Sequence, residues 1–273
     1  MIGARLTLAV LVFSKTAAYR HEAIPEGIRA IEEVGKELGW TVSATEDAGV
    51  FSDEGLARFD AVVFLMTTGD VLDSGQQAAF ERFIEKGKGY VGVHSASDTE
   101  YDWPFYGSLV GAYFRSHPEI QPATYRVEDR EHPATRHLPP FWVRTDEHYS
   151  FRENPRGRVQ VLVSLDEGSY EPGTDAMGDH PVVWCRELEG GGRSFYTALG
   201  HTKESYSDPL FRKHLASAIA WAAARPPRQD RELPKGRSLP PFPPRPSTAT
   251  LARSSCRMPA HPKALFPRKE LPS

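Results

Sequence analysis

The sequence of 273 residues contains only two cysteines, Cys185 and Cys256. Cys185 lies in a strand-like apolar run and Cys256 in a polar segment, and no Cys-x-x-Cys pair occurs. Because a disulfide framework needs several suitably placed cysteines, none is expected here.

Long apolar runs are also absent. The longest one near the N-terminus, Leu6 to Phe13, is far too short to cross a bilayer, so we expect no membrane span. Lys15 follows this run closely and no polar region precedes it, which favours a buried first strand over a secretory signal. We therefore expect a cytoplasmic protein.

Basic stripes are missing from most of the chain. The formal net charge is −3, but the segment 225–273 holds 11 Lys and Arg against 3 Asp and Glu, which leaves residues 1–224 at −11. Phosphate contacts need clustered Lys and Arg, so nucleic acid is not expected as the partner, and polyanionic substrates are disfavoured.

Proline is concentrated at the C-terminal end. Twelve of the 23 prolines fall within 226–273, where no apolar periodicity occurs. This composition predicts a structural domain over 1–224 and a disordered, proline-rich basic tail over 225–273. A role of the tail as a proline-rich ligand stays open, although a tolerated extension is the simpler interpretation.

The remaining pattern alternates between strands and helices. Strand-like runs occupy 5–13, 41–45, 60–66 and 89–93, and helical apolar spacing occupies 24–38 and 74–87. This rhythm predicts an α/β fold with a mostly parallel sheet and helices on both faces. Strands then follow more directly, at 124–128, 141–151, 159–165, 182–187 and 194–199, and a last helix spans 208–223. They predict an antiparallel extension of the sheet.

The carboxyl ends of parallel strands are where such sheets bind ligands. The segment after the first strand offers Tyr19, Arg20 and His21, and the one after the fourth offers His94 and Asp98. We therefore expect these side chains to lie at one edge of the sheet.

The last two strands add more candidates by their hairpin geometry. If the turn centres near Gly190 and Gly191, His180 lies opposite the end of the strand that leads to His201. The neighbouring strand supplies Glu147 and Tyr149. The prediction is one pocket shared by four imidazoles, and the remaining histidines of the body are interpreted as structural or surface residues: His117, His132, His137, His148 and His214.

A divalent metal such as zinc is one hypothesis for this pocket, with His21, His94, His180 and His201 as its ligands. The chain has no His-Glu-x-x-His motif, so the metal stays open. It also lacks a phosphate-binding loop and a Gly-x-Gly-x-x-Gly turn, which argues against nucleotide and flavin cofactors.

Several motifs together resemble the ThuA-like family, the trehalose-utilisation proteins. They are Gly92-Val93-His94-Ser95-Ala96, Tyr19-Arg20-His21, Asp146-Glu147-x-Tyr149, His180-Pro181-Val182-x-Trp184 and the segment from Gly192-Arg193 to Gly200-His201-Thr202. The resemblance covers about 5–224. It implies a flavodoxin-like fold of the class I glutamine amidotransferase-like type.

The first of these motifs resembles a nucleophile elbow with His94 in the nucleophile position. Glutaminase chemistry needs a cysteine there, so we expect no glutaminase activity, and Cys185 is interpreted as core packing. Ser95 stands one residue beyond and is expected to point elsewhere, which disfavours a serine hydrolase.

The family's link to disaccharide use, beside dehydrogenases that make 3-keto sugars, implies a small-molecule sugar substrate and a keto-sugar isomerase or lyase. In this hypothesis His94 and Glu147 exchange protons with the sugar, and His201 and His21 complete the catalytic set. The expected substrate contacts are Tyr19, Arg20, Asp98, Tyr149 and His180, with Arg20 or Tyr149 stabilising the developing oxyanion.

The alternative is a non-catalytic sugar-binding or regulatory protein with a degenerate amidotransferase pocket. The aromatic side chains of Tyr101, Trp103, Phe105 and Tyr106 could stack on sugar rings in such a protein, although packing of a helix against the sheet is the simpler interpretation. An assembly of identical copies stays open.

Overall fold

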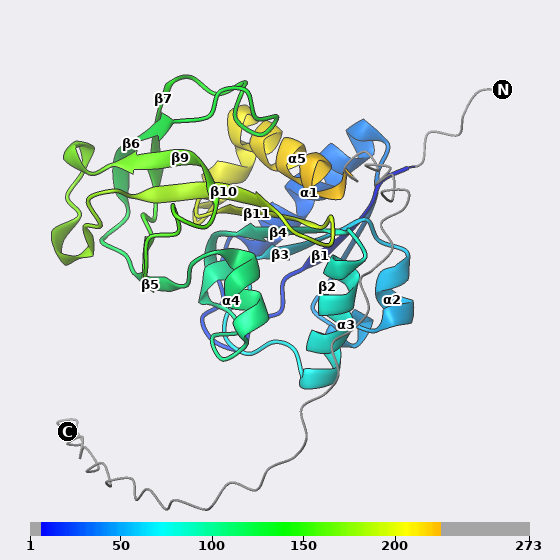
Figure 1. Ribbon diagram of the computed structural model, residues 1–273. Helices are drawn as coiled ribbons and strands as arrows, with labels where there is room; N and C mark the ends of the chain where they lie inside the picture. Colours follow the sequence, from blue (N-terminus) through cyan, green and yellow to red (C-terminus); the bar gives the residue numbers. More distant parts are fainter. Residues whose placement is uncertain (1–6, 225–273) are drawn as a thin grey trace, which may run out of the picture. The chain divides into compact units, whose positions relative to one another are not determined.

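The computed structural model describes residues 7–224, and the predicted tail over 225–273 lies outside the described residues. These residues form a nine-stranded sheet in the order β2-β1-β3-β4-β11-β10-β9-β6-β7 and a separate two-stranded sheet, β5-β8 (Figure 1). Within the described part of the chain, no helix combines the length and the apolar character needed to cross a bilayer.

One half of the large sheet is parallel. Its strands are β1 (Ala9–Phe13), β2 (Thr41–Thr45), β3 (Ala61–Leu65), β4 (Gly89–Val93) and β11 (Arg193–Thr197). Their order, 2-1-3-4 followed by the last strand, is that of flavodoxin-like folds. β3 and β4 are buried at every position, which explains why their sequences are almost continuously apolar.

The other half is antiparallel. It consists of β10 (Pro181–Glu187), β9 (Gln160–Asp166), β6 (Gln121–Val127) and β7 (Phe141–Asp146), while β5 (Phe114–Ser116) pairs with β8 (Ser150–Phe151). Four successive antiparallel pairings separate β11 from β7. Since each pairing reverses the direction, β7 runs in the same direction as β11 and β4.

Helices cover both faces of the sheet (Figure 1). α1 (Ile24–Leu38) and α5 (Pro209–Ala223) lie together on one face, and α3 (Ser74–Glu85) and α4 (Pro104–Val110) lie on the other, with α2 (Asp53–Ala57) beside α3. α5 approaches β4 so closely that a Cβ atom on Gly89 would lie 2.5 Å from the carbonyl oxygen of Ala222. This contact explains why glycine stands at the start of that strand.

Most predicted elements agree with the structure, and the α/β prediction with an antiparallel extension is confirmed. The helix over 24–38 ends at Gly39, whose φ of 75° suits a residue without a side chain. The single strand predicted over 141–151 is wrong, because the chain leaves the sheet after Asp146 and pairs again only at Ser150. The interruption holds Glu147, which leaves this carboxylate free to point away from the sheet.

Candidate functional site

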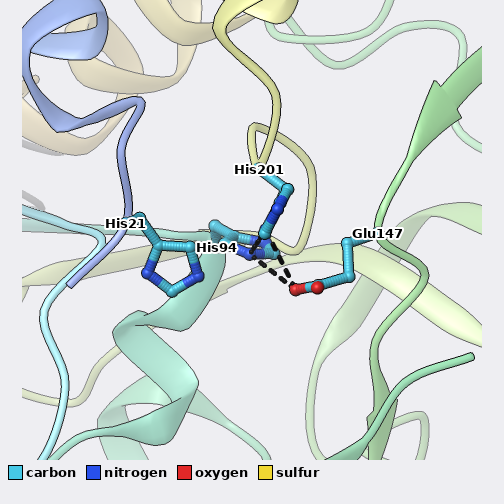
Figure 2. A group of neighbouring side chains, drawn as sticks. All are labelled: His21, His94, Glu147 and His201. Carbon is cyan, nitrogen blue, oxygen red and sulfur yellow. Dashed lines mark hydrogen bonds and ion pairs between the residues drawn. The ribbon is translucent and has the colours of Figure 1, made fainter. Parts of the chain in front are cut away.

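Four side chains meet beyond the carboxyl edge of the sheet. His21 follows β1, His94 follows β4, Glu147 follows β7 and His201 follows β11. Because these strands run in the same direction, their carboxyl ends bring the four residues together (Figure 2). One potential ligand atom from each lies within 4.8 Å of the others.

Three of these atoms are spaced like ligands around a common centre. His94 Nε2 lies 3.1 Å from His201 Nδ1 and 3.3 Å from Glu147 Oε2, and His201 Nδ1 lies 3.0 Å from the same oxygen. Ligands about 2.0 Å from a tetrahedral zinc ion lie about 3.3 Å apart. The spacing therefore fits a small divalent cation with only minor adjustment of the side chains.

His94 is held in one orientation by the backbone. It has a φ of 53°, the left-handed conformation that aims a side chain outward at a strand-to-helix elbow. Its Nδ1 donates to the carbonyl oxygen of Ala198 at 2.8 Å, and its ring stacks on Tyr149 with centroids 4.2 Å apart. Since Nδ1 bonds this carbonyl, Nε2 is the nitrogen that faces the cluster.

Glu147 and His201 are tied together by the buried side chain of Asp146. Its carboxylate accepts hydrogen bonds of 3.0 Å from the backbone N–H groups of Glu147, Gly200 and His201. The Arg144 guanidinium lies 3.6 Å away. Asp146 therefore joins two segments that are distant in the sequence and fixes the spacing of their side chains.

The surroundings of His21 and Glu147 keep these two side chains in their deprotonated forms. Burial, together with the neighbouring His94 and His201, lowers the pKa of His21 to about 2. Burial by itself would raise the pKa of Glu147, but the hydrogen bond from His201 and the electrostatic influence of the two neighbouring imidazoles outweigh it and hold this pKa well below its usual range. His21 is thus neutral and Glu147 ionised at neutral pH, which are the forms that bind a metal.

His201 behaves differently. Burial acts to lower its pKa, but the hydrogen bond and the charge of Glu147 outweigh burial and raise it. His201 Nδ1 therefore carries a proton when no cation is bound. This proton lies between the acceptor atoms of the cluster. A bound cation would replace this proton.

A cavity of about 280 Å³ opens onto the cluster. Besides His21 and Glu147, its lining consists of Tyr19, Asp98, Phe114, His117 and Tyr149. Burial raises the pKa of the Asp98 carboxyl, which accepts a hydrogen bond of 2.6 Å from the Tyr101 hydroxyl. The cavity thus combines aromatic walls with one carboxylate outside the cluster.

Two predicted site residues lie elsewhere. His180 does lie near the end of β11, as its register requires, but Nε2 donates to the carbonyl of Tyr149 and Nδ1 pairs with Glu167, both at 2.8 Å. The predicted grouping of His180 with the other three histidines is therefore wrong, because the fourth side chain of the cluster is Glu147. Arg20 forms an exposed ion pair with Glu46 and does not line the cavity, so its predicted substrate contact is not supported.

Two side chains that the sequence did not predict in the site contact it. His117, interpreted as structural, lines the cavity and places Nε2 3.2 Å from Oε1 of Glu147. Ser95 was expected to point elsewhere, yet its hydroxyl lies 3.3 Å from Nδ1 of His21. His117 stands at no predicted strand end and in no quoted motif, and Ser95 stands one residue beyond the nucleophile position, so only the tertiary contacts reveal their place in the site.

Cys185 is buried away from this site, and burial raises the pKa of its thiol to about 12. His132 lies 3.8 Å from the sulfur, but its Nδ1 accepts from the backbone N–H of Ala134, so the proton sits on Nε2 and the ring is not a base for the thiol. The predicted role in core packing agrees with this burial. Trp103 and Tyr106 are buried as well and do not line the cavity, which agrees with packing of α4.

A family model described as trehalose utilisation, ThuA, matches residues 9–222. The chain belongs to the ThuA family. The match spans all four residues of the cluster, and it confirms the resemblance of the sequence motifs. No curated protein sequence matches the chain.

Solved structures of ThuA-like proteins share the fold. One from Bacteroides uniformis is 25% identical, with a TM-score of 0.67 over 79% of this chain and 91% of its own. One from Parabacteroides merdae is 18% identical, with a TM-score of 0.65 over 80% and 90%. A cytoplasmic protein from Salmonella typhimurium, 11% identical, reaches a TM-score of 0.56 over 79% and 99%. The ThuA assignment is consistent with the first two of these neighbours.

Proposed function

We propose that this ThuA protein is a divalent-cation-dependent enzyme that acts on keto derivatives of disaccharides, as an isomerase or a lyase. The observation that carries the proposal is the convergence of His21, His94, His201 and Glu147 beside a cavity. Three imidazoles and one carboxylate form a donor set that suits zinc and similar ions.

The donor set also fits a cation by its charge. Glu147 is ionised and nearly buried, and with Nδ1 bonded to a carbonyl the neutral form of His94 would offer it only a lone pair. Two buried acceptors 3.3 Å apart need a proton or a cation between them. A bound divalent ion would supply Lewis acidity that polarises a substrate carbonyl.

The chain's own residues would supply the rest of the chemistry. Asp98 takes the proton from the carbon beside the carbonyl, and its raised pKa makes it a stronger base than an ordinary aspartate. The electrons of that C–H bond form the enolate. For an isomerisation, the hydroxyl proton on that carbon moves to the former carbonyl oxygen, and Asp98 returns its proton to the former carbonyl carbon. For an elimination, the glycosidic oxygen β to the carbonyl departs with the bonding electrons and takes up the proton from Asp98.

The walls of the cavity suit a sugar ring. Phe114, Tyr149 and the largely exposed Tyr19 line the cavity, and the Tyr149 ring centroid lies 4.2 Å from that of Phe114. Aromatic faces and polar edges of this kind bind sugars by stacking and hydrogen bonding. His117 is half exposed and contacts Glu147 beside this cavity.

The proposal is tested by metal analysis of the purified full chain, followed by NMR spectra of 3-keto disaccharides with the apo-protein and with added zinc. We expect about one metal ion per chain and substrate conversion that depends on it. Saturable sugar binding without chemical change would favour the non-catalytic alternative. Absence of both metal and turnover would overturn the proposal.

A further inference from the structure

Exposed apolar side chains gather at one edge of the large sheet. Phe141 and Val143 are 60% and 67% exposed and both lie on β7, and Ile120, directly before the neighbouring strand β6, is 47% exposed. β7 is the last strand of the sheet (Figure 1). Among the described residues, the opposite edge strand β2 exposes no large apolar side chain.

The backbone groups of β7 that point away from β6 have no strand to pair with in the part of the chain that the structure describes. The N–H of Val127 donates to Pro140, so alternation of the ladder directs the polar backbone groups of Trp142 and Arg144 toward β6. Those of Phe141, Val143 and Thr145 therefore point away from it. Within residues 7–224, no other strand pairs with them.

Edge strands of monomeric proteins are usually protected by lysine, proline, a bulge or an inward-pointing charge. The outward residues of β7 are Phe141, Val143 and Thr145, which carry no charge, and the pairing with β6 is regular over all six residues. The charged residues Arg144 and Asp146 face the buried side. The strand thus lacks lysine, proline and a bulge, and its inward-pointing charges are paired within the chain, because Arg144 forms ion pairs with Asp146 and Asp208.

We propose that β7 pairs antiparallel with β7 of a second copy of this chain, so that two sheets become continuous across a two-fold axis. The strand complements itself in this register. Val143 lies opposite Val143 of the partner subunit, and Phe141 lies opposite Thr145 of the partner subunit. About six backbone hydrogen bonds form, since each of these pairs exchanges both N–H groups.

The side chains on the buried face of β7 are also compatible with this two-fold axis. Trp142 lies opposite Arg144 of the partner subunit, an indole beside a guanidinium. Within one chain the Arg144 guanidinium already lies 4.5 Å from the centroid of Trp142. No pair of like charges is brought face to face, so a second copy suits this edge.

The experiment measures the mass of the full chain by sedimentation between about 1 and about 100 µM, a range that resolves micromolar dissociation constants. The wild type is expected at twice 30.4 kDa. Val143→Lys and Val143→Glu, each alone, place like charges on the axis and are expected at 30.4 kDa. An equimolar mixture of the two variants is expected to recover the doubled mass, because only this axis places position 143 opposite itself.

Ala44→Lys on the exposed edge of β2 is the matched control and keeps the doubled mass. Circular dichroism confirms that each variant is folded. A wild type of 30.4 kDa at every concentration would show that another occupant, or none, covers this edge and would overturn the proposal. Variants at position 143 that keep the doubled mass singly, or that fail to restore it when mixed, would overturn it as well.

Discussion

The carboxylate of Asp146 accepts a hydrogen bond of 3.0 Å from the backbone N–H of His201, a residue 55 positions away in the chain. The same oxygen accepts from the N–H of Glu147, also at 3.0 Å. Both partners belong to the proposed cation site. A buried side chain that has no contact with the cavity therefore sets the distance between two of the ligands, in the way that second-shell carboxylates orient metal ligands.

Asp146→Asn tests this relationship. The amide keeps the shape of the side chain but loses its charge and one acceptor, so the zinc affinity should fall by about 10- to 100-fold. Competition with a chelator measures the affinity. Asp208→Asn is the matched control, because Asp208 also pairs with Arg144 but bonds neither Glu147 nor His201. Equal losses in both variants would show that the arginine network, and not the link to the ligands, is responsible.

His94→Ala and Glu147→Gln should each remove the bound metal. Each substitution deletes one donor from a set of four, so the metal content should fall from about one ion per chain toward zero. Elemental analysis after gel filtration gives this ratio. His137→Ala serves as the control, since its ring bonds the carbonyl of Leu210 and lies outside the cluster. Full metal content in either cluster variant would contradict the assignment of that ligand.

Asp98→Asn should separate catalysis from metal binding. An amide cannot accept the proton, so kcat should fall by about 10²- to 10⁴-fold while the metal content stays unchanged. Tyr101→Phe removes the hydrogen bond to Asp98 and should change the rate far less. NMR conversion of the keto sugar measures both variants. Undiminished turnover in Asp98→Asn would assign the base elsewhere in the cavity.

Acid should destabilise the protein through the buried His214. Burial is the main cause that lowers the pKa of this imidazole to about 3, against 6.5 for the free side chain. The unfolded state therefore binds the extra proton first, and the free energy of unfolding falls as the pH drops from about 6.5 toward 3. Above pH 6.5 the imidazole is neutral in both states, so His214 causes no loss of the free energy of unfolding.

Urea unfolding between pH 7.5 and pH 4 measures the effect. His214→Leu should make the free energy of unfolding depend less on pH. The substitution removes a group that in acid binds a proton in the unfolded state but stays neutral in the folded state. Phe211→Leu, a change in the neighbouring ring, should lower the stability without altering that slope. A slope unchanged by His214→Leu would locate the acid sensitivity in other buried histidines.

The sequence predicted the frame of the molecule well. Apolar periodicity and a terminal glycine defined the helix over 24–38, and continuous apolar runs defined the central strands, because these signals act locally along the chain. The rule that ligands bind at the carboxyl edge then selected His21 and His94, and the hairpin geometry of the last two strands added His201. It succeeded because strand direction alone decides which strand ends meet.

The sequence by itself determined the fold class and named all four clustered residues, although it predicted proton transfer and not metal binding for Glu147. Tertiary structure decided three further features: the end of the strand after Asp146, which lets Glu147 leave the sheet, the contact of His180 with Glu167, and the position of His117 beside the cavity. The physical reason is that side-chain direction depends on hydrogen bonds between segments far apart in sequence. Such bonds, above all those to Asp146, leave no periodic pattern along the chain.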